Sequence, residues 1–280
     1  MEDLSVLIQN ADYIRCRQHR NDLLLTGFVR DLANMCKNAD GLTDPIRIYR
    51  SVFGDSMCTP EFASFCAEVF VDGGVDVIGA RLPDTVQFQS TPTSAIISYQ
   101  QNSYSDRALQ IFLKRLASAH SFSLPTTVSV CEEVYYGRST HCILPIYSSQ
   151  DGILTAFTKL ISKYGLMINA VCDVSMADGD STMRFALLSS AFVLPNADPC
   201  YLQFNAVLPQ AEDLGKLIIS CESVRAIVTE IITQPLTYAE DTISYTIRLR
   251  TSVANLPSLV VFLHTVLDKF TLEGAFSILQ

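Results

Sequence analysis

The sequence predicts a mixed α/β and α+β protein built from three successive units. Three observations predict this. Apolar residues recur at helical spacing up to residue 70, β-prone runs alternate with helical runs from residue 95, and a strand–helix–strand–strand–helix–strand order follows residue 200. We expect a helical unit over 1–82, an α/β unit over 94–194 and a third unit over 198–280, with a linker rich in proline, serine and threonine at 82–93.

The composition of the 280 residues argues against several classes of function. A hydrophobic fraction of 49% is enough for a sizeable core, and a formal net charge of -9 argues against a nucleic acid partner. The nine cysteines are scattered without a Cys-x-x-Cys pair, so we expect reduced thiols, no metal and no cofactor. No apolar run is long enough to span a membrane and the first residues do not resemble a signal peptide, so we expect a cytoplasmic protein.

The N-terminal unit has the pattern of one long helix and two shorter ones. Residues 4–37 keep a helical spacing of apolar residues with charged residues between them. A break at 38–45 is followed by a short helix at 46–53. A third helix starts at Thr59 and Pro60, where threonine suits the N-cap and proline suits the first helical position.

This helical order resembles the small chorismate mutase domain that precedes the dehydratase in bifunctional bacterial enzymes. The matching residues are Asp44 to Arg47, at the opening of the second helix, and Thr59 to Phe70. The resemblance implies a dicarboxylate site formed by arginines and a lysine, a geometry that suits guanidinium groups. Arg47 falls at such a position and is the candidate substrate-binding residue, although a solvated charged face is the alternative.

The middle unit alternates strands with helices, which predicts a parallel sheet covered by helices. We expect strands at 95–99, 126–130, 141–146, 167–174 and 183–192, and helices at 106–116, 131–137 and 153–164. From His141 to Gly152 a buried strand runs through a proline into a polar turn that opens a helix. Ser148 and Ser149 are N-cap residue types, and such a turn presents N–H groups and hydroxyls to a ligand, but an ordinary strand-to-helix turn has the same pattern.

Residues 144–152 resemble a signature of the prephenate dehydratases, Leu-Pro-Ile-Glu-Asn-Ser followed by two free positions and glycine. Residues 103–105 stand where that family has Ser-Tyr-Ser before a helix, and residues 183–185 where it has Thr-Arg-Phe. The resemblance implies two lobes with the substrate between them. The implied substrate contacts are Ser103, Tyr104, Ser105 and Ser148, and the implied catalytic groups, if any activity remains, are Ser149 and Arg184.

The chain departs from this family at the groups that carry the chemistry. Tyr147 and Ser148 replace the glutamate and the asparagine, and Met183 replaces the threonine whose hydroxyl the dehydration is thought to need. Thr182 is no substitute, because adjacent strand residues face opposite sides of a sheet. Residues 183–185 also follow Val174 almost at once, so we expect the second lobe to be missing.

Removal of one positioned catalytic group commonly costs about two to four orders of magnitude in rate. We therefore expect a non-catalytic prephenate-dehydratase-like protein with a regulatory or assembly role related to aromatic amino acid metabolism. The alternative is an active enzyme, a prephenate dehydratase, a chorismate mutase or both, in L-phenylalanine biosynthesis.

The third unit has the pattern of a ferredoxin-like plait. We expect strands at 200–208, 226–233, 242–250 and 274–279, with helices at 213–225 and 257–270. This order resembles the ACT domain that senses phenylalanine in the dehydratases, which implies a small aromatic acid or amino acid as ligand and a homodimer formed through apolar faces. The implied ligand turns are at Leu214 and Gly215 and at Thr233, Gln234 and Pro235; the acidic residue and the arginine of the second turn are absent.

Overall fold

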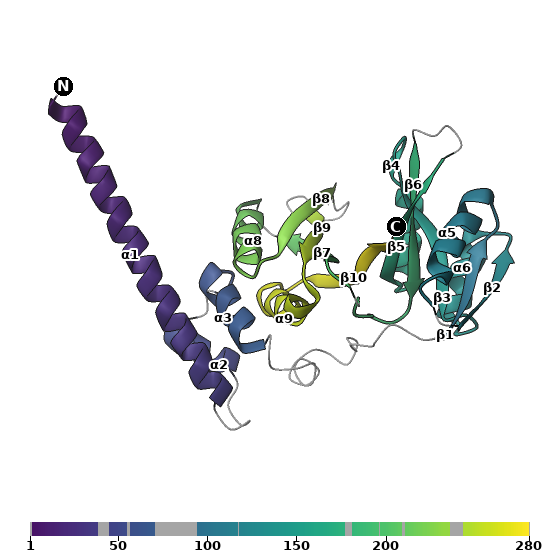
Figure 1. Ribbon diagram of the computed structural model, residues 1–280, viewed down its shortest axis with the longest axis horizontal. Coiled ribbons are helices and arrows are strands. Elements are labelled where there is room, and N and C mark those ends of the chain that lie inside the picture. Colours follow the sequence, from purple (N-terminus) through teal and green to yellow (C-terminus); the bar gives the residue numbers. More distant parts are fainter. Residues whose placement is uncertain are drawn as a thin grey trace.

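A computed structural model describes residues 2–38, 45–54, 57–70, 94–116, 118–176, 181–195, 197–208, 211–235 and 243–279. Within these residues, ten strands form one sheet that helices flank, and three N-terminal helices lie at one end of it (Figure 1). The expected linker at 82–93 and most of the turn at 178–181 lie outside the described residues. No described helix is long and apolar enough to cross a bilayer.

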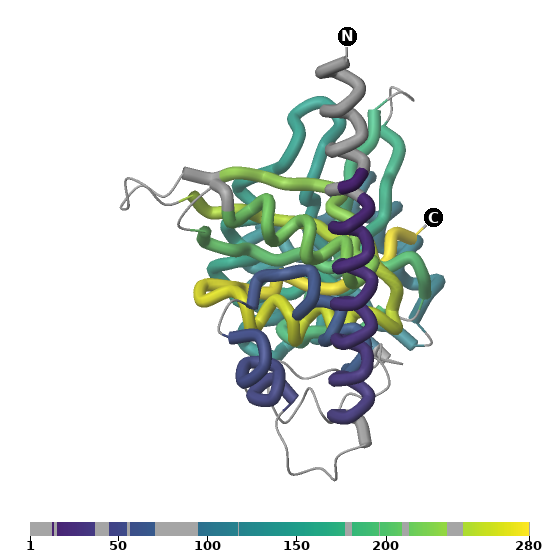
Figure 2. The backbone as a smooth tube through the Cα atoms, turned by 90° about the vertical axis from the view of Figure 1, so that its left-hand side faces the viewer, coloured from purple at the N-terminus to yellow at the C-terminus, as the bar shows by residue number. Residues whose placement is uncertain are grey.

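The three N-terminal helices form as predicted: α1 is Glu2–Asn38, α2 is Pro45–Phe53 and α3 is Pro60–Phe70. Oγ1 of Thr59 accepts a hydrogen bond from the N–H of Phe62 at 3.2 Å, which caps α3. Val29 and Ala33, in the C-terminal part of α1, are buried in the core that includes α3. Residues 16–24 of α1 are exposed and project away from the sheet (Figure 1, Figure 2).

The α/β lobe follows these helices. Its strands are β1 (Ser94–Gln100), β2 (Ser118–Leu124), β3 (His141–Ser148), β4 (Gly152–Ile153), β5 (Met167–Ser175) and β6 (Thr182–Ser189). Its helix α5 (Ser103–Leu113) covers one face of the sheet, and α6 (Thr127–Tyr135) and α7 (Thr155–Lys163) cover the other.

The sheet of this lobe is mixed, so the prediction of a parallel sheet was wrong for half of it. Its strands follow the order β2-β1-β3-β6-β5. β1 is parallel to β2 and β3, whereas β6 is antiparallel to β3 and β5. The chain between β5 and β6 is too short for a crossover helix, and strands joined by a short connection can pair only in antiparallel fashion.

Two element boundaries in this lobe also differ from the prediction. Residues 126–130, predicted as a strand, begin α6, because Oγ1 of Thr126 accepts the N–H of Ser129 at 3.1 Å and caps that helix. The strand itself, β2, has mostly exposed side chains and therefore lacks the apolar alternation by which strands are recognised. α5 begins three residues earlier than predicted, because Asn102 is its N-cap.

The last unit has the predicted strand–helix–strand–strand–helix–strand order, which we call the plait. Its elements are β7 (Cys200–Leu208), α8 (Ala211–Ser223), β8 (Ile227–Pro235), β9 (Ile243–Thr251), α9 (Leu256–Val266) and β10 (Phe270–Leu279). β10, β7, β9 and β8 are neighbours in that order and pair in antiparallel fashion. α8 and α9 pack against one face, where Leu202, Phe204 and Ile247 are buried.

β10 joins the plait to the lobe, because it is antiparallel to β7 on one side and parallel to β5 on the other. Gly274 lies at an irregularity in both pairings and has a φ of 147°. A Cβ at this position would overlap the carbonyl oxygen of Ile168 on β5. The close approach of the two strands therefore requires glycine.

The N-terminal helices share a hydrophobic core with the plait rather than with the lobe. The ring of Phe62 on α3 lies 6.0 Å from that of Phe262 on α9, measured between centroids.

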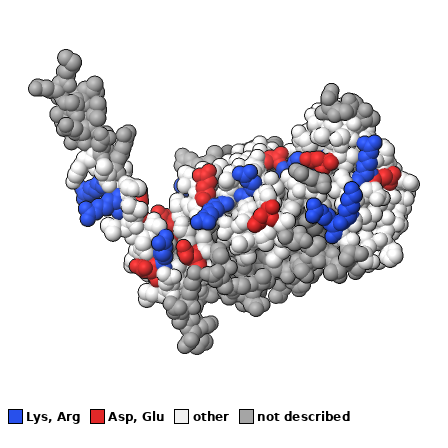
Figure 3. Space-filling view, in the orientation of Figure 1, with Lys and Arg blue, Asp and Glu red and all other residues white. Residues whose placement is uncertain are grey.

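On the face of the molecule drawn in Figure 3, basic and acidic side chains are interspersed, with one group of basic side chains on α1.

Candidate functional site

Ser148 and Ser149 lie in the turn that follows β3. Oγ of Ser148, which is 1% exposed, accepts hydrogen bonds from the N–H groups of Gln150 and Asp151 at 3.2 and 3.4 Å. Oγ of Ser149 accepts the N–H of Thr182 at 2.9 Å, and its own N–H donates to the carbonyl of Thr182 at 2.9 Å. Neither hydroxyl caps α7, whose N-cap makes no side-chain hydrogen bond. The two serines therefore hold the turn and attach it to β6.

Ser103, Tyr104 and Ser105 form the first turn of α5. Oδ1 of Asn102 accepts the N–H groups of Tyr104 and Ser105 at 3.1 and 2.8 Å, so the cap occupies donors that an anionic ligand would otherwise use. Ser105 is buried, with 2% of its surface exposed. Next in the helix, Arg107 donates to the carbonyl at the end of β5 at 3.2 Å. The start of α5 thus lies at the same sheet edge as the end of β5.

Among the predicted site residues whose side chains the structure describes, Arg184 is the one that lines the cavity between the lobe and the last unit. Its Nε and Nη2 donate to Oδ1 and Oδ2 of Asp173 at 2.7 and 2.9 Å, in a bidentate pair across β5 and β6. This hydrogen bonding raises the pKa of Arg184. The guanidinium also lies 5.7 Å from the ring centroid of Tyr147. The charge of Arg184 is therefore already balanced by a residue of the same sheet.

Met183 and Thr182 face opposite sides of β6, as the alternation of strand residues predicts. Met183 packs in the cluster formed by α5 and one face of the sheet, together with Val174. Thr182 is exposed. No hydroxyl of β6 thus takes the place that Met183 occupies under α5.

The remaining predicted residues are dispersed. Arg47 is exposed on α2, and Leu214 and Gly215 lie inside helix α8 rather than in a turn. Thr233 is exposed near the end of β8. Gln234 and Pro235 pair through the backbone with Ser244 and Ile243, while their side chains lie outside the described part of the chain. The structure does not bring Arg47, Leu214, Gly215 or Thr233 to the cavity that Arg184 lines.

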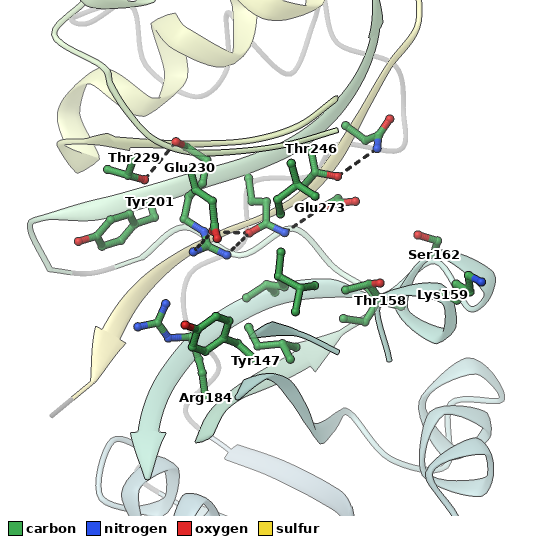
Figure 4. Close-up of a pocket in the computed structure, with 18 of the residues that line it drawn as sticks. Tyr147, Thr158, Lys159, Ser162, Arg184, Tyr201, Thr229, Glu230, Thr246 and Glu273 are labelled. Atoms are coloured by element: carbon green, nitrogen blue, oxygen red, sulfur yellow. Dashed lines mark hydrogen bonds and ion pairs between the residues drawn. The ribbon is translucent and has the colours of Figure 1, made fainter. Parts of the chain in front are cut away.

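That cavity, of about 730 Å³, lies between the α/β lobe and the plait. One wall is the face of the plait opposite α8 and α9, and the other is formed by β3, β6 and α7 (Figure 4). Its apolar lining includes six isoleucines from both walls: Ile146, Ile153, Ile161, Ile168, Ile232 and Ile278. Volume and lining are typical of small-molecule sites.

The plait wall of the cavity carries a row of four polar side chains, one from each strand, which we call the polar row. Glu230, Arg248, Gln203 and Glu273 come from β8, β9, β7 and β10 in spatial order. Nη1 of Arg248 lies 2.5 Å from Oε2 of Glu230, and its Nε and Nη2 donate to Oε1 of Gln203 at 3.0 and 2.8 Å. Nε2 of Gln203 donates to Oε2 of Glu273 at 2.8 Å.

Burial shifts the pKa values of two side chains of the polar row. It raises the pKa of the Glu273 carboxyl and lowers the pKa of Arg248, since both charged forms are removed from water. Sequence reasoning missed all four residues. Three of them, Gln203, Glu230 and Arg248, are polar residues on the side of a predicted strand opposite its apolar residues, whereas Glu273 precedes the predicted strand at 274–279. Even these three indicate a site only once the strand order is known.

Among the described residues, no cluster of three or more histidine, cysteine, aspartate or glutamate side chains is placed to hold a metal ion. All nine cysteines are free thiols, and Cys16 is the exposed one.

Solved structures of prephenate dehydratases resemble the fold. The enzyme from Streptococcus mutans is 15% identical with a TM-score of 0.53, over 66% of this chain and 99% of that chain. The enzyme from Arthrobacter aurescens in complex with L-Phe is 12% identical with a TM-score of 0.52, over 65% of this chain and 90% of that one. GqqA, a novel type of quorum quenching acylase, is 17% identical with a TM-score of 0.52, over 65% of this chain and 94% of that one.

No protein-family model matches the sequence, and the search of curated proteins gave no match. The chain has a mixed α/β fold like that of the prephenate dehydratases, and at these identities the likeness concerns the fold alone. One of the similar structures is an acylase, so this fold carries more than one activity.

Proposed function

We propose that the protein is a non-catalytic relative of the prephenate dehydratases that binds a small molecule and has a regulatory or assembly role related to aromatic amino acid metabolism. One observation carries this proposal. The polar side chains at the expected reaction edge are engaged in the structure itself: Ser148 and Ser149 in the turn, and Arg184 in its bidentate pair with Asp173.

Dehydration requires a group that protonates the departing hydroxyl. A thioether has no proton to donate, so Met183 cannot do this, and Oγ of Ser149 is held against β6 by the N–H of Thr182. Each missing group costs about 10²–10⁴ in rate. The combined loss supports a protein that keeps the fold without the reaction.

Ligand binding is supported by the cavity between lobe and plait, whose 730 Å³ falls within the range of about 300–1,000 Å³ for small-molecule sites. The similar enzyme from Arthrobacter aurescens is in complex with L-Phe. For this chain we propose a small aromatic or amino-acid-derived ligand, bound by a homodimer. The mostly buried free thiols agree with a cytoplasmic location.

The test is an activity assay combined with a binding assay. We expect no phenylpyruvate from prephenate above the spontaneous rate, and no prephenate from chorismate. Activity that is lost in Ser149→Ala or Arg184→Lys would establish a dehydratase instead, and mutase activity lost in Arg47→Ala would establish a mutase. A cognate ligand at about 100 times its Kd should raise the free energy of unfolding by about 2.7 kcal/mol.

A further inference from the structure

We propose that the polar row anchors a small organic cation, a primary amine with an apolar body, in the cavity between lobe and plait. This inference rests on the proposed ligand-binding function and specifies the ligand class. It follows from the charge of the row, from its unused hydrogen-bonding capacity and from the isoleucines that face it.

The polar row carries one negative charge in excess when its members are ionised. Glu230 and Glu273 are two carboxylates, Arg248 is the one cation between them, and Gln203 is neutral. A buried charge without a partner is costly, and a ligand cation would remove that cost. The other arginine that lines the cavity, Arg184, interacts with Glu230 at longer range, but its bidentate partner is Asp173.

The Glu273 carboxylate has hydrogen-bonding capacity that an ammonium can use. Among the described residues, Glu273 accepts one hydrogen bond, through Oε2, from Gln203. Oε2 of Glu230 is buried and contacts Arg248 as an ion pair without the alignment of a hydrogen bond. An ammonium group has three N–H donors, so it can donate to Glu273, and its positive charge also offsets the negative charge of Glu230. Figure 4 shows Glu230 and Glu273 on the same wall of the cavity.

The rest of the cavity fits an apolar body better than a second charge. Isoleucines of both walls, such as Ile161 of α7 and Ile232 of β8, line it. A ligand carboxylate next to its ammonium would approach Glu230 and Glu273, and Arg248 is already shared between Gln203 and Glu230. An amine should therefore bind more tightly than the corresponding amino acid. The lysines of α7, Lys159 and Lys163, are exposed rather than part of the row.

Calorimetric titration of the full chain at pH 7.5 tests this with ligands that share one apolar body. The first set is phenethylamine, phenylalanine and 3-phenylpropionate, and the second is isopentylamine, leucine and 4-methylpentanoate. We expect saturable binding of at least one amine, at least about 10-fold tighter than that of its amino acid, and no binding of the acids. Failure of both amines to bind, or an amino acid that binds as tightly as its amine, overturns the inference.

Two charge variants locate the site. Glu273→Gln and Glu230→Gln keep the shape of the side chain and remove the negative charge, and each should weaken amine binding at least about 10-fold. Glu222→Gln, at an exposed position of α8, is the matched control and should leave binding unchanged. Unchanged binding in both row variants places the amine elsewhere and overturns the inference.

The outcomes separate this inference from the proposed function. If an amino acid binds more tightly than its amine and the row variants abolish that binding, the ligand-binding function stands while the amine class is wrong. If the protein converts prephenate or chorismate, the proposed function is wrong, whatever the titrations with amines show.

Discussion

His141 is a titratable side chain that burial keeps neutral at the start of β3. It is 3% exposed, its Nδ1 lies 2.8 Å from Oγ1 of Thr140, and burial lowers its pKa to about 4. An unfolded histidine takes up its proton near pH 6.5. Between that pH and about 4 the unfolded chain binds more protons than the folded one, so stability falls as the pH falls through this window.

We expect His141 to contribute a loss of about 2–3 kcal/mol in the free energy of unfolding between pH 7 and pH 4.5. Urea denaturation at both pH values measures it. His141→Gln should lose this part of the pH dependence, whereas His120→Gln, at an exposed position, should keep it. If the free energy of unfolding falls by the same amount between pH 7 and pH 4.5 in the wild type and in His141→Gln, this side chain does not titrate as its burial implies.

Glu273 should make stability depend on pH in the direction opposite to His141. Because burial raises its pKa, the folded chain binds more protons than the unfolded one just above the ordinary glutamate range, and stability falls as the pH rises through that interval. Glu273→Gln removes the free-energy cost of ionising a buried carboxyl group. We expect the variant to gain stability relative to the wild type from pH 4 to pH 8 in thermal denaturation, and a constant or shrinking difference would contradict the assignment.

Single residues of the candidate site could be predicted only as far as strand periodicity reaches. The alternation of side chains along a strand correctly separated Met183 from Thr182. The pairing of Arg184 with Asp173 depends on the register of β5 against β6, which periodicity does not supply. Ser148 and Ser149 were predicted as cap residues because their types suit a cap, yet the same hydroxyls suit turns equally well.

At the scale of elements, strongly amphipathic segments were predictable and edge strands were not. The long helix α1 and the strands β7, β8 and β9 follow their predicted ranges closely, because their apolar residues recur at regular spacing, whereas β10 begins at Phe270, before the predicted start at Gly274. β2 was missed, since it is exposed along most of its length. Its neighbour, the start of α6, was mistaken for a strand because β-branched residues precede and open that helix.

The junction of β10 with β5 provides a prediction at this scale. Gly274→Ala places a Cβ against the backbone of Ile168, whose N and C atoms lie 2.6 and 2.9 Å from it, at a φ that alanine rarely adopts. We expect a loss of more than about 3 kcal/mol in the free energy of unfolding, because neither backbone can move without breaking strand pairs.

Gly215→Ala is the control for this substitution. Gly215 is exposed inside α8, and a methyl group added there would have no atom of another element within 4 Å, so alanine should stabilise the helix by up to about 1 kcal/mol. Chemical denaturation compares the two variants. If Gly274→Ala is as stable as the wild type, the close contact between β10 and β5 does not exist as described.

For the whole molecule, the strand order decides where chemistry can occur. The polar row collects residues 203, 230, 248 and 273, which lie far apart in the sequence and meet because β10, β7, β9 and β8 are neighbours. The plait order was predictable from its elements, but its junction with the lobe through β10 was not, and the cavity exists only through that junction. This is why the cavity escaped sequence reasoning.

The outer side of α1 leads to the prediction of a homodimer. Tyr13, Leu24, Phe28 and Met35 are each at least half exposed, and spacings of 11, 4 and 7 residues bring them to one side of the helix. Exposed apolar stripes of this kind are typical of protein interfaces. A second copy of the chain can cover the stripe with its own, since closed homodimers use the same surface twice.

We expect light scattering at micromolar concentration to give twice the chain mass of 30.9 kDa. Leu24→Glu combined with Met35→Glu should give a monomer, because four charges would be buried at a two-fold interface. Asn34→Glu, at an exposed position off the stripe, is the matched control and should remain dimeric. Circular dichroism should show the same helix content in all three proteins. A monomeric wild type, or a double variant that keeps the dimer mass, would rule out association through this side of α1.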